Sequence, residues 1–215
     1  MFTAVLWDFG GVFTTSPFEN FTRFEAAQGI PKDFIRKVNS TSPDTNAWAR
    51  LEASEISRDE FDGLFAAEAR ALGQEIRGAE VLELLSGELR PAMVYALDLI
   101  RAKYKTACLT NNIRDAGEGP GMASDQQRAK AVAQVFERFD AVIESSVVGI
   151  RKPNPDFYKL ACKTLDVEPA DSLFLDDLGI NLKPARALGM TTIKVLTEDQ
   201  ALDDLSVALD MDLRA

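Results

Sequence analysis

Short apolar segments that end in polar or acidic residues alternate with helical segments over most of the chain. The first of them, Phe2–Trp7, ends at Asp8. Similar segments occur at 106–110, 141–145, 173–175 and 192–195. Strands that are apolar on both faces are typical of parallel sheets covered by helices on both sides. The pattern predicts βαβ units, and hence an α/β fold whose core is a three-layer α/β/α arrangement around a parallel sheet.

A block of helical signals separates the first predicted strand from the second. Ser16 and Ser57 each begin a capping box, and a proline follows Ser16 at the first helical position. No convincing strand pattern falls between them or after them until about residue 88. We therefore predict a small helical cap, residues 16–88, inserted after the first strand, and a core made of residues 1–15 and 89–215.

Charge and composition exclude several classes of function. The 215 residues carry a formal net charge of −10 and include no histidine. The charge argues against nucleic acid or an anionic membrane as a partner, because such surfaces need clustered Lys and Arg. The absence of histidine removes the mechanisms that depend on imidazole, and it removes the common zinc sites.

The cysteines and the apolar runs predict the compartment. Cys108 and Cys162 lie in apolar stretches and are expected to be buried thiols, although the sequence leaves a disulfide between them open. The first residues lack a basic leader, and no apolar run approaches the roughly 20 residues that span a bilayer. We therefore expect a cytoplasmic protein without a membrane partner, either a monomer or a homodimer.

The polar residues that follow the predicted strands are the candidate functional residues. In an open parallel sheet, ligands bind outside the carboxyl ends of the strands. These residues are Asp8, Gly10 and Gly11 after the first strand, Thr110, Asn111 and Asn112 after the second, Lys152 after the third, and Asp176 and Asp177 at the end of the fourth. A nucleophilic acid, a hydroxyl, a cation and an acidic pair at one edge are typical of phosphoryl transfer.

Each of these groups has a chemical reason to be there. Mg²⁺ prefers hard oxygen ligands, which the carboxylates of Asp8 and Asp177 and the backbone carbonyl of Gly10 can supply. The cation would let Asp8 attack the phosphorus of a small-molecule phosphate and form an aspartyl phosphate. Thr110 and Lys152 would then hold the oxygens over which negative charge spreads, with nearby backbone amides as further donors.

Four segments of the chain, in the same order, resemble the four motifs of the haloacid dehalogenase superfamily. They are Asp8–Val12, Leu109–Asn112, Lys152 with Pro153, and Phe174–Asp177. Segments 149–156 and 174–190 are also similar to the phosphatase domain at the N-terminus of soluble epoxide hydrolases. The resemblance implies a Rossmann-like core with a helical cap and a Mg²⁺-dependent phosphohydrolase activity. It implies Asp8 as nucleophile, Lys152 as charge neutraliser, Thr110, Asn111, Lys152 and Gly11 as phosphate binders, Asp8, Gly10 and Asp177 as metal ligands, and Asp176 and Asn112 as supporting residues.

One position departs from the family pattern and leaves three functions open. Phosphatases of the family usually carry a second Asp two residues after the nucleophile, as general acid and base, and this chain has Gly10 there. The first function is the phosphohydrolase. The second is a metal-independent dehalogenase in which Asp8 attacks carbon, which the acidic pair disfavours because it would repel a carboxylate substrate. The third is a pseudo-phosphatase that only binds a ligand.

Aromatic residues are frequent in the predicted cap and around its start. They are Phe13, Phe18, Phe21, Phe24, Phe34, Trp48, Phe61 and Phe65. They would line a pocket for a lipophilic substrate or pack the interior of the cap. Their helical spacing favours packing.

Overall fold

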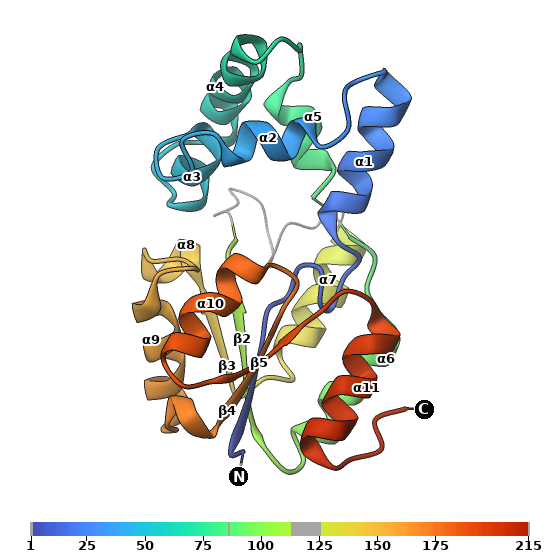
Figure 1. The fold of residues 1–215 in the computed structure, drawn as a ribbon, viewed down its shortest axis with the longest axis vertical. Coiled ribbons are helices and arrows are strands. Elements are labelled where there is room, and N and C mark those ends of the chain that lie inside the picture. The colour runs from blue at the N-terminus through green and yellow to red at the C-terminus, as the bar shows by residue number, and fades with distance from the viewer. Residues whose placement is uncertain (1, 86, 113–125, 215) are drawn as a thin grey trace.

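The computed structural model describes residues 2–85, 87–112 and 126–214. A sheet flanked by helices forms one part of the molecule, and a separate group of helices lies above it (Figure 1). The polar, glycine-rich segment 114–124, for which the sequence predicts a loop, lies outside the described residues.

The described residues form one parallel sheet of five strands in the order β3-β2-β1-β4-β5. The strands are β1 (Ala4–Trp7), β2 (Lys105–Thr110), β3 (Ala141–Glu144), β4 (Ser172–Asp176) and β5 (Thr191–Lys194). Trp7 of the central strand lies opposite Cys108 on one side and Leu175 on the other. This register brings Asp8, Thr110 and Asp176 to the same edge of the sheet. The predicted α/β fold with a parallel sheet is confirmed.

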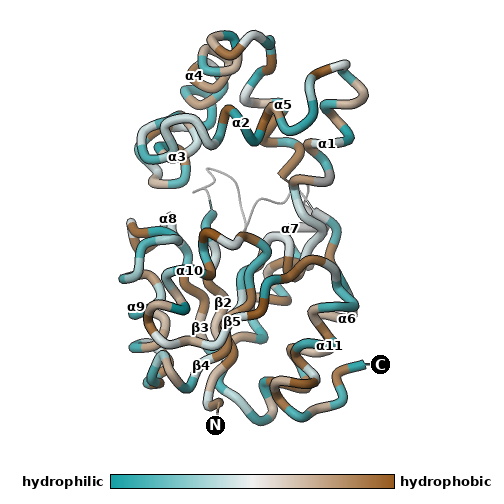
Figure 2. Tube along the Cα trace, in the orientation of Figure 1, coloured by the Kyte–Doolittle hydropathy of each residue, from teal (hydrophilic) through white to brown (hydrophobic). Residues whose placement is uncertain are grey.

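Helices cover both faces of the sheet. Successive strand residues point to opposite sides, and they are apolar on both. Val5 and Trp7 pack against one set of helices, and Ala4 and Leu6 pack against the other. The first set is α6 (Pro91–Ile100), α7 (Gln126–Phe136) and α11 (Glu198–Leu209), and the second is α9 (Pro155–Leu165) and α10 (Gly179–Ala187). The short helices α8 (Ser145–Val148) and η1 (Pro169–Asp171) complete the connections. Hydrophobic residues follow the strands between these layers (Figure 2).

The upper group of helices has a hydrophobic core of its own, and we call it the cap. Its helices are α1 (Pro17–Gln28), α2 (Phe34–Ser40), α3 (Ala47–Glu52), α4 (Arg58–Ala71) and α5 (Gly78–Glu83). The Ser16 side chain accepts a hydrogen bond at the start of α1, and Ser57 forms a complete capping box at the start of α4. Phe34, Phe61 and Phe65 are buried inside this group, as the packing interpretation expects. The boundaries at residues 15/16 and 88/89 stay a prediction.

Two linkers that lie side by side connect the cap to the core. The amide of Thr15 donates to the Glu88 carbonyl oxygen at 2.8 Å, and the amide of Arg90 donates to the Phe13 carbonyl oxygen at 2.8 Å. Thr14 and Leu89 form an antiparallel bridge between these bonds. The chain therefore leaves the core and returns to it at one place.

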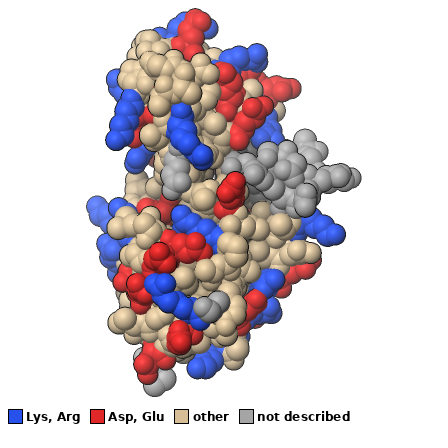
Figure 3. Space-filling model, turned by 90° about the vertical axis from the view of Figure 1, so that its right-hand side faces the viewer, with Lys and Arg blue, Asp and Glu red and all other residues tan. Residues whose placement is uncertain are grey.

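The two cysteines are too far apart in the fold to form a disulfide. Cys108 and Cys162 are free and buried, and they belong to hydrophobic clusters on opposite faces of the sheet, which excludes the disulfide left open by the sequence. Basic and acidic side chains are interspersed on the face seen in Figure 3. In the described part of the chain, no helix combines the length and apolar character needed to cross a membrane.

Candidate active site

The loop after β1 places Asp8 at the carboxyl edge of the sheet. The Asp8 amide donates to the Leu175 carbonyl oxygen at 2.8 Å, which extends the ladder between β1 and β4 by one residue. Gly11 follows with a φ of +73°, and a Cβ atom there would overlap the Asp177 carboxylate. A side chain at position 11 would therefore be strained by its backbone and would also displace one of the acids of the site.

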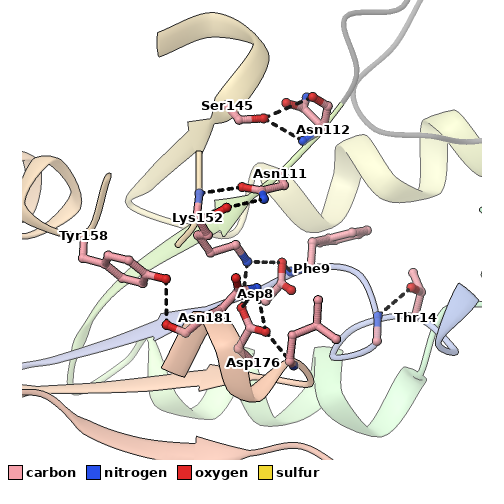
Figure 4. A network of polar contacts seen from close by, with 12 residues as sticks. Asp8, Phe9, Thr14, Asn111, Asn112, Ser145, Lys152, Tyr158, Asp176 and Asn181 are labelled. Atoms are coloured by element: carbon pink, nitrogen blue, oxygen red, sulfur yellow. Dashed lines mark hydrogen bonds and ion pairs between the residues drawn. The ribbon is translucent and has the colours of Figure 1, made fainter. Parts of the chain in front are cut away.

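Lys152 is the cation around which the site is built. Its side chain is 1% exposed, and Nζ lies 2.7 Å from Asp8 Oδ1 and 2.8 Å from Asp176 Oδ2 (Figure 4). Burial alone would lower the pKa of this ammonium, but Asp176 and Asp8 outweigh that effect and raise its pKa above the usual range. Lys152 therefore stays protonated in the site.

The acidic groups exceed this one positive charge. Burial raises the pKa of Asp8 well above its ordinary value; Lys152 partly offsets that, and Asp176 and Asp177 raise it further. Burial, followed by repulsion from Asp176, raises the pKa of Asp177 to about 6. Three carboxylates share one ammonium, so the site favours a further cation.

The donor set of this cluster fits Mg²⁺. Asp8, Asp176 and Asp177 each offer an oxygen atom, and these atoms lie within 4.8 Å of one another. Asp176 is already occupied: it accepts hydrogen bonds from Lys152, from the Leu178 amide at 2.8 Å and from Asn181 Nδ2 at 3.1 Å. Asp8 and Asp177 accept fewer hydrogen bonds from the protein, and their role as metal ligands stays a prediction.

The residues after β2 hold the neighbouring loops in place. Asn111 Nδ2 donates to the Lys152 carbonyl oxygen at 3.0 Å, and the Lys152 amide donates to Asn111 Oδ1 at 2.9 Å (Figure 4). The Asn112 amide donates to Ser145 Oγ at 3.0 Å, and its side chain also bonds to Glu144 and Ser146. The side chain of Asn111 thus positions the backbone of Lys152. The predicted contact of Asn111 with phosphate stays a prediction. Asn112 supports the loop.

The site also contains residues that the sequence pattern does not assign to it. Tyr158 OH donates to the Asn181 carbonyl oxygen at 2.7 Å, behind the amide that holds Asp176. Ser16, at the start of the cap, donates from Oγ to Asp177 Oδ2 at 3.3 Å. Tyr158 lies on the buried face of α9, where its position in the sequence is indistinguishable from that of a core residue.

A cavity of about 480 Å³ opens above these groups, between the cap and the core. Asp8, Thr110, Lys152 and Asp177 line its polar end, and Gly10 and Asn111 lie beside them. Much of the remaining wall is apolar, with Phe18, Phe21 and Trp48 supplied by the cap and Phe9 and Phe136 by the core. Three of the aromatic residues in the predicted cap therefore face the cavity, while others pack the cap interior.

The sequence of the chain is similar to those of known hydrolases. A family model described as haloacid dehalogenase-like hydrolase matches residues 2–189. Mouse acyl-CoA dehydrogenase family member 10 is 32% identical over 99% of this chain, and pig bifunctional epoxide hydrolase 2 is 31% identical over 94% of it. The chain spans only 20% and 38% of the length of these two relatives. A sesquiterpene phosphatase of Aspergillus oryzae is 27% identical over 88% of this chain and 87% of its own length.

Solved structures share the fold. A predicted HAD-like family hydrolase of Porphyromonas gingivalis superposes with a TM-score of 0.66 at 22% identity, over 98% of this chain and 99% of its own. A HAD family enzyme of Bacteroides thetaiotaomicron, in complex with magnesium and inorganic phosphate, gives 0.57 at 20% identity, over 90% and 94% of the two chains. L-2-haloacid dehalogenase of Xanthobacter autotrophicus gives 0.60 at 23% identity, over 97% and 83%. By the match of its sequence to the family over residues 2–189, this chain belongs to the haloacid dehalogenase-like hydrolases.

Proposed function

We propose that the chain is a magnesium-dependent phosphohydrolase in which Asp8 attacks the phosphorus of a small organic phosphate. The observation that carries this proposal is the position of Lys152 Nζ, between Asp8 and Asp176 and at the polar end of the cavity. A buried cluster of three carboxylates and one ammonium favours a divalent cation, and a phosphate group brings the oxygens that such a cation lacks. A carboxylate substrate would add negative charge without this compensation, which argues against the dehalogenase.

The reaction would proceed in two displacements at phosphorus. In the first, an Asp8 oxygen forms a bond to phosphorus and the ester oxygen leaves with the bonding electron pair, taking a proton from water. Lys152 and Thr110 donate hydrogen bonds to the phosphoryl oxygens, where charge is spread in the transition state. In the second, water attacks phosphorus and releases a proton to the solvent, which replaces the proton taken in the first step. The bond from phosphorus to the Asp8 oxygen breaks, inorganic phosphate leaves, and the Asp8 carboxylate is regenerated.

A bound Mg²⁺ would be held by Asp8, Asp177 and the Gly10 carbonyl group. It would screen the repulsion between the phosphate and the carboxylates. Asp176 keeps Lys152 in place, because all of its oxygens are engaged within the protein.

The walls of the cavity support a substrate with an apolar body. Phe18, Phe21 and Trp48 line the cavity from the cap, and Asp8 and Lys152 line it from the core. A phosphate ester with a hydrocarbon or aromatic moiety would bury apolar surface there while its phosphate reaches Asp8. The name of the Aspergillus relative, a sesquiterpene phosphatase, is consistent with this choice.

The test is hydrolysis of p-nitrophenyl phosphate by purified protein with Mg²⁺, with EDTA, and with EDTA followed by excess Mg²⁺. We expect release of inorganic phosphate only when Mg²⁺ is present. L-2-chloropropionate serves as the parallel substrate, and chloride release that is insensitive to EDTA would identify the dehalogenase instead. Binding of phosphate without turnover of several aryl and acyl phosphates would identify the pseudo-phosphatase.

A further inference from the structure

An ion pair joins the cap to the wall of the site. Glu52, the last residue of α3, pairs with Arg151 of the core, and Arg151 Nη2 also donates to the Pro43 carbonyl oxygen in the cap at 3.3 Å. The Glu52 and Arg151 side chains are 11% and 27% exposed, and both residues line the cavity above Asp8. One guanidinium group thus holds two groups of the cap.

Arg151 directly precedes Lys152 in the chain, and the backbone of Lys152 is held by Asn111. The two hydrogen bonds between Asn111 and the Lys152 backbone tie this segment to the end of β2. The backbone that presents Lys152 Nζ to Asp8 is therefore fixed between the end of β2 and the cap. A movement of the cap that displaces Arg151 would act on this backbone.

We propose that the Glu52–Arg151 ion pair couples closure of the cap to the position of Lys152, so that its ammonium is set between Asp8 and Asp176 when the cap is closed. Arg151 is in this sense a positioning residue. The kinetic part of the proposal rests on the proposed phosphatase function. The conformational part does not depend on turnover.

The energetics of the pair suit a contact that opens and closes. A partly buried ion pair gives little net stabilisation, because the cost of removing both charges from water offsets their attraction. Burial raises the pKa of Glu52, and Arg151, which lies beside it, only partly offsets this effect. Removal of Arg151 would leave the Glu52 carboxylate with the Trp48 side chain as a hydrogen-bond partner but without its ion-pair partner. We expect the cap to open in that variant, because opening hydrates the charge.

The chain contains a fluorescent reporter of this movement. It has two tryptophans, and Trp7 is fully buried in the sheet, so its contribution to quenching stays constant. Trp48 lies one helical turn before Glu52 and lines the cavity. Because acrylamide is uncharged, the charge that a substitution removes does not itself attract or repel the quencher. Trp48 is hydrogen-bonded to Glu52, so its exposure is sensitive to the position of that side chain.

The experiment compares the full chain with Arg151→Met, Arg151→Met/Glu52→Met and Arg50→Met. Arg50 is the matched control, because it lies on the same helix as Glu52 and pairs within the cap, with Glu55 at 3.9 Å. We expect Arg151→Met to increase the acrylamide quenching constant about twofold and to lower kcat for p-nitrophenyl phosphate roughly tenfold with a smaller change in KM. That split follows because Lys152 acts on charge that develops in the transition state. The double variant should return quenching close to the wild-type value, since no buried charge remains, and Arg50→Met should change neither readout.

Three results would overturn the proposal. The first is unchanged quenching in Arg151→Met, and the second is an equal response of Arg151→Met and Arg50→Met. The third is increased quenching with unchanged kcat, which would separate the cap from Lys152. If Arg151→Met does not fold, Arg151→Lys keeps the charge but cannot hold Glu52 and Pro43 together, and we expect it to give intermediate values. Wild-type protein without phosphatase activity would contradict the proposed function, and the quenching series would still test the ion pair.

Discussion

Asn111 and Lys152 are joined by two hydrogen bonds, of 3.0 and 2.9 Å, between one amide side chain and both polar groups of one backbone residue. The asparagine therefore acts on the site through the lysine. Two different sets of contacts therefore hold Lys152. The Asn111 amide fixes its backbone, while Asp8 and Asp176 hold its ammonium group.

Asn111→Ala is expected to reduce kcat for p-nitrophenyl phosphate between about tenfold and about a hundredfold, because a small displacement of a catalytic group is costly. The control is Asn154→Ala, which removes the side-chain cap of α9. This second change should lower the melting temperature, since such a cap stabilises by about 1 kcal/mol, and should leave kcat unaltered. Equal kcat in Asn111→Ala and wild type would show that the two bonds are not needed for catalysis.

Asp8→Asn is expected to abolish turnover while the fold is retained. The buried Asp8 carboxyl has a raised pKa, so removal of its charge relieves repulsion with Asp176 and Asp177. In EDTA at pH 7 the melting temperature should therefore equal or exceed that of wild type. Circular dichroism and phosphate release measure the two effects, with the exposed Asp156→Asn as control. Full activity in a folded Asp8→Asn protein would exclude Asp8 as the nucleophile.

Mg²⁺ is expected to bind the folded chain and to raise its melting temperature. A ligand that binds only the folded state stabilises it by about 2.7 kcal/mol at a concentration one hundred times Kd. Asp177→Asn should weaken binding in titration calorimetry at least tenfold, whereas Asp156→Asn should not. Unchanged Mg²⁺ affinity in Asp177→Asn would place the metal ion elsewhere.

Gly10→Asp is expected to speed the hydrolysis of esters with poor leaving groups. A Cβ atom at position 10 meets no other atom within 4 Å, so the new side chain has room beside the cavity. A general acid contributes roughly 10²–10⁴ in rate when the leaving oxygen needs a proton, and p-nitrophenolate needs none. The measurement is kcat/KM over a series of alkyl and aryl phosphates. Wild-type rates that do not depend on leaving-group pKa would reveal another acid in the site.

Glu52→Gln is expected to change how stability depends on pH. Burial raises the pKa of Glu52 above its ordinary value of 4.5, so the folded state holds the proton more tightly than the unfolded state does. Its contribution to stability is therefore greatest below pH 4.5 and is lost as the pH rises through the higher folded value. Glutamine does not ionise, so the variant should gain melting temperature relative to wild type as the pH rises above 4.5. Glu55→Gln, at an exposed position on the same segment, should show no such trend.

Much of the core can be predicted from the sequence, because buried parallel strands leave a direct signal. The apolar run before Asp8 predicts β1, although the strand begins at Ala4 and not at Phe2. The end of an element depends on where the ladder of hydrogen bonds stops, and residue types report that poorly. The order of the strands also depends on tertiary packing, and the sequence pattern predicts only that they are parallel.

The grouping of the candidate residues around one cavity could be predicted to the extent that they follow strands. Asp8, Thr110 and Asp177 line one cavity, and Lys152 lies with them although it follows β3 by several residues. The contacts of Tyr158 and Glu52 could not be predicted, since each is made with a residue distant in sequence. A helix face that packs against another part of the chain shows the same spacing of residues as one that packs within its own group of helices.

Because the two linkers lie side by side, the cap is inserted into the core at a single place. Thr15 and Glu88 are 73 residues apart in sequence and are hydrogen-bonded to each other. The residues between them therefore form one loop whose two ends meet at the core. The entropy of closing a loop rises only with the logarithm of its length, and a doubling costs about 0.6 kcal/mol. The region above the sheet can therefore be shortened, enlarged or exchanged with little penalty to the strands below. The cap can therefore change in length while the strands that carry the polar residues keep their register, provided that its contacts with Asp177 and Arg151 are kept.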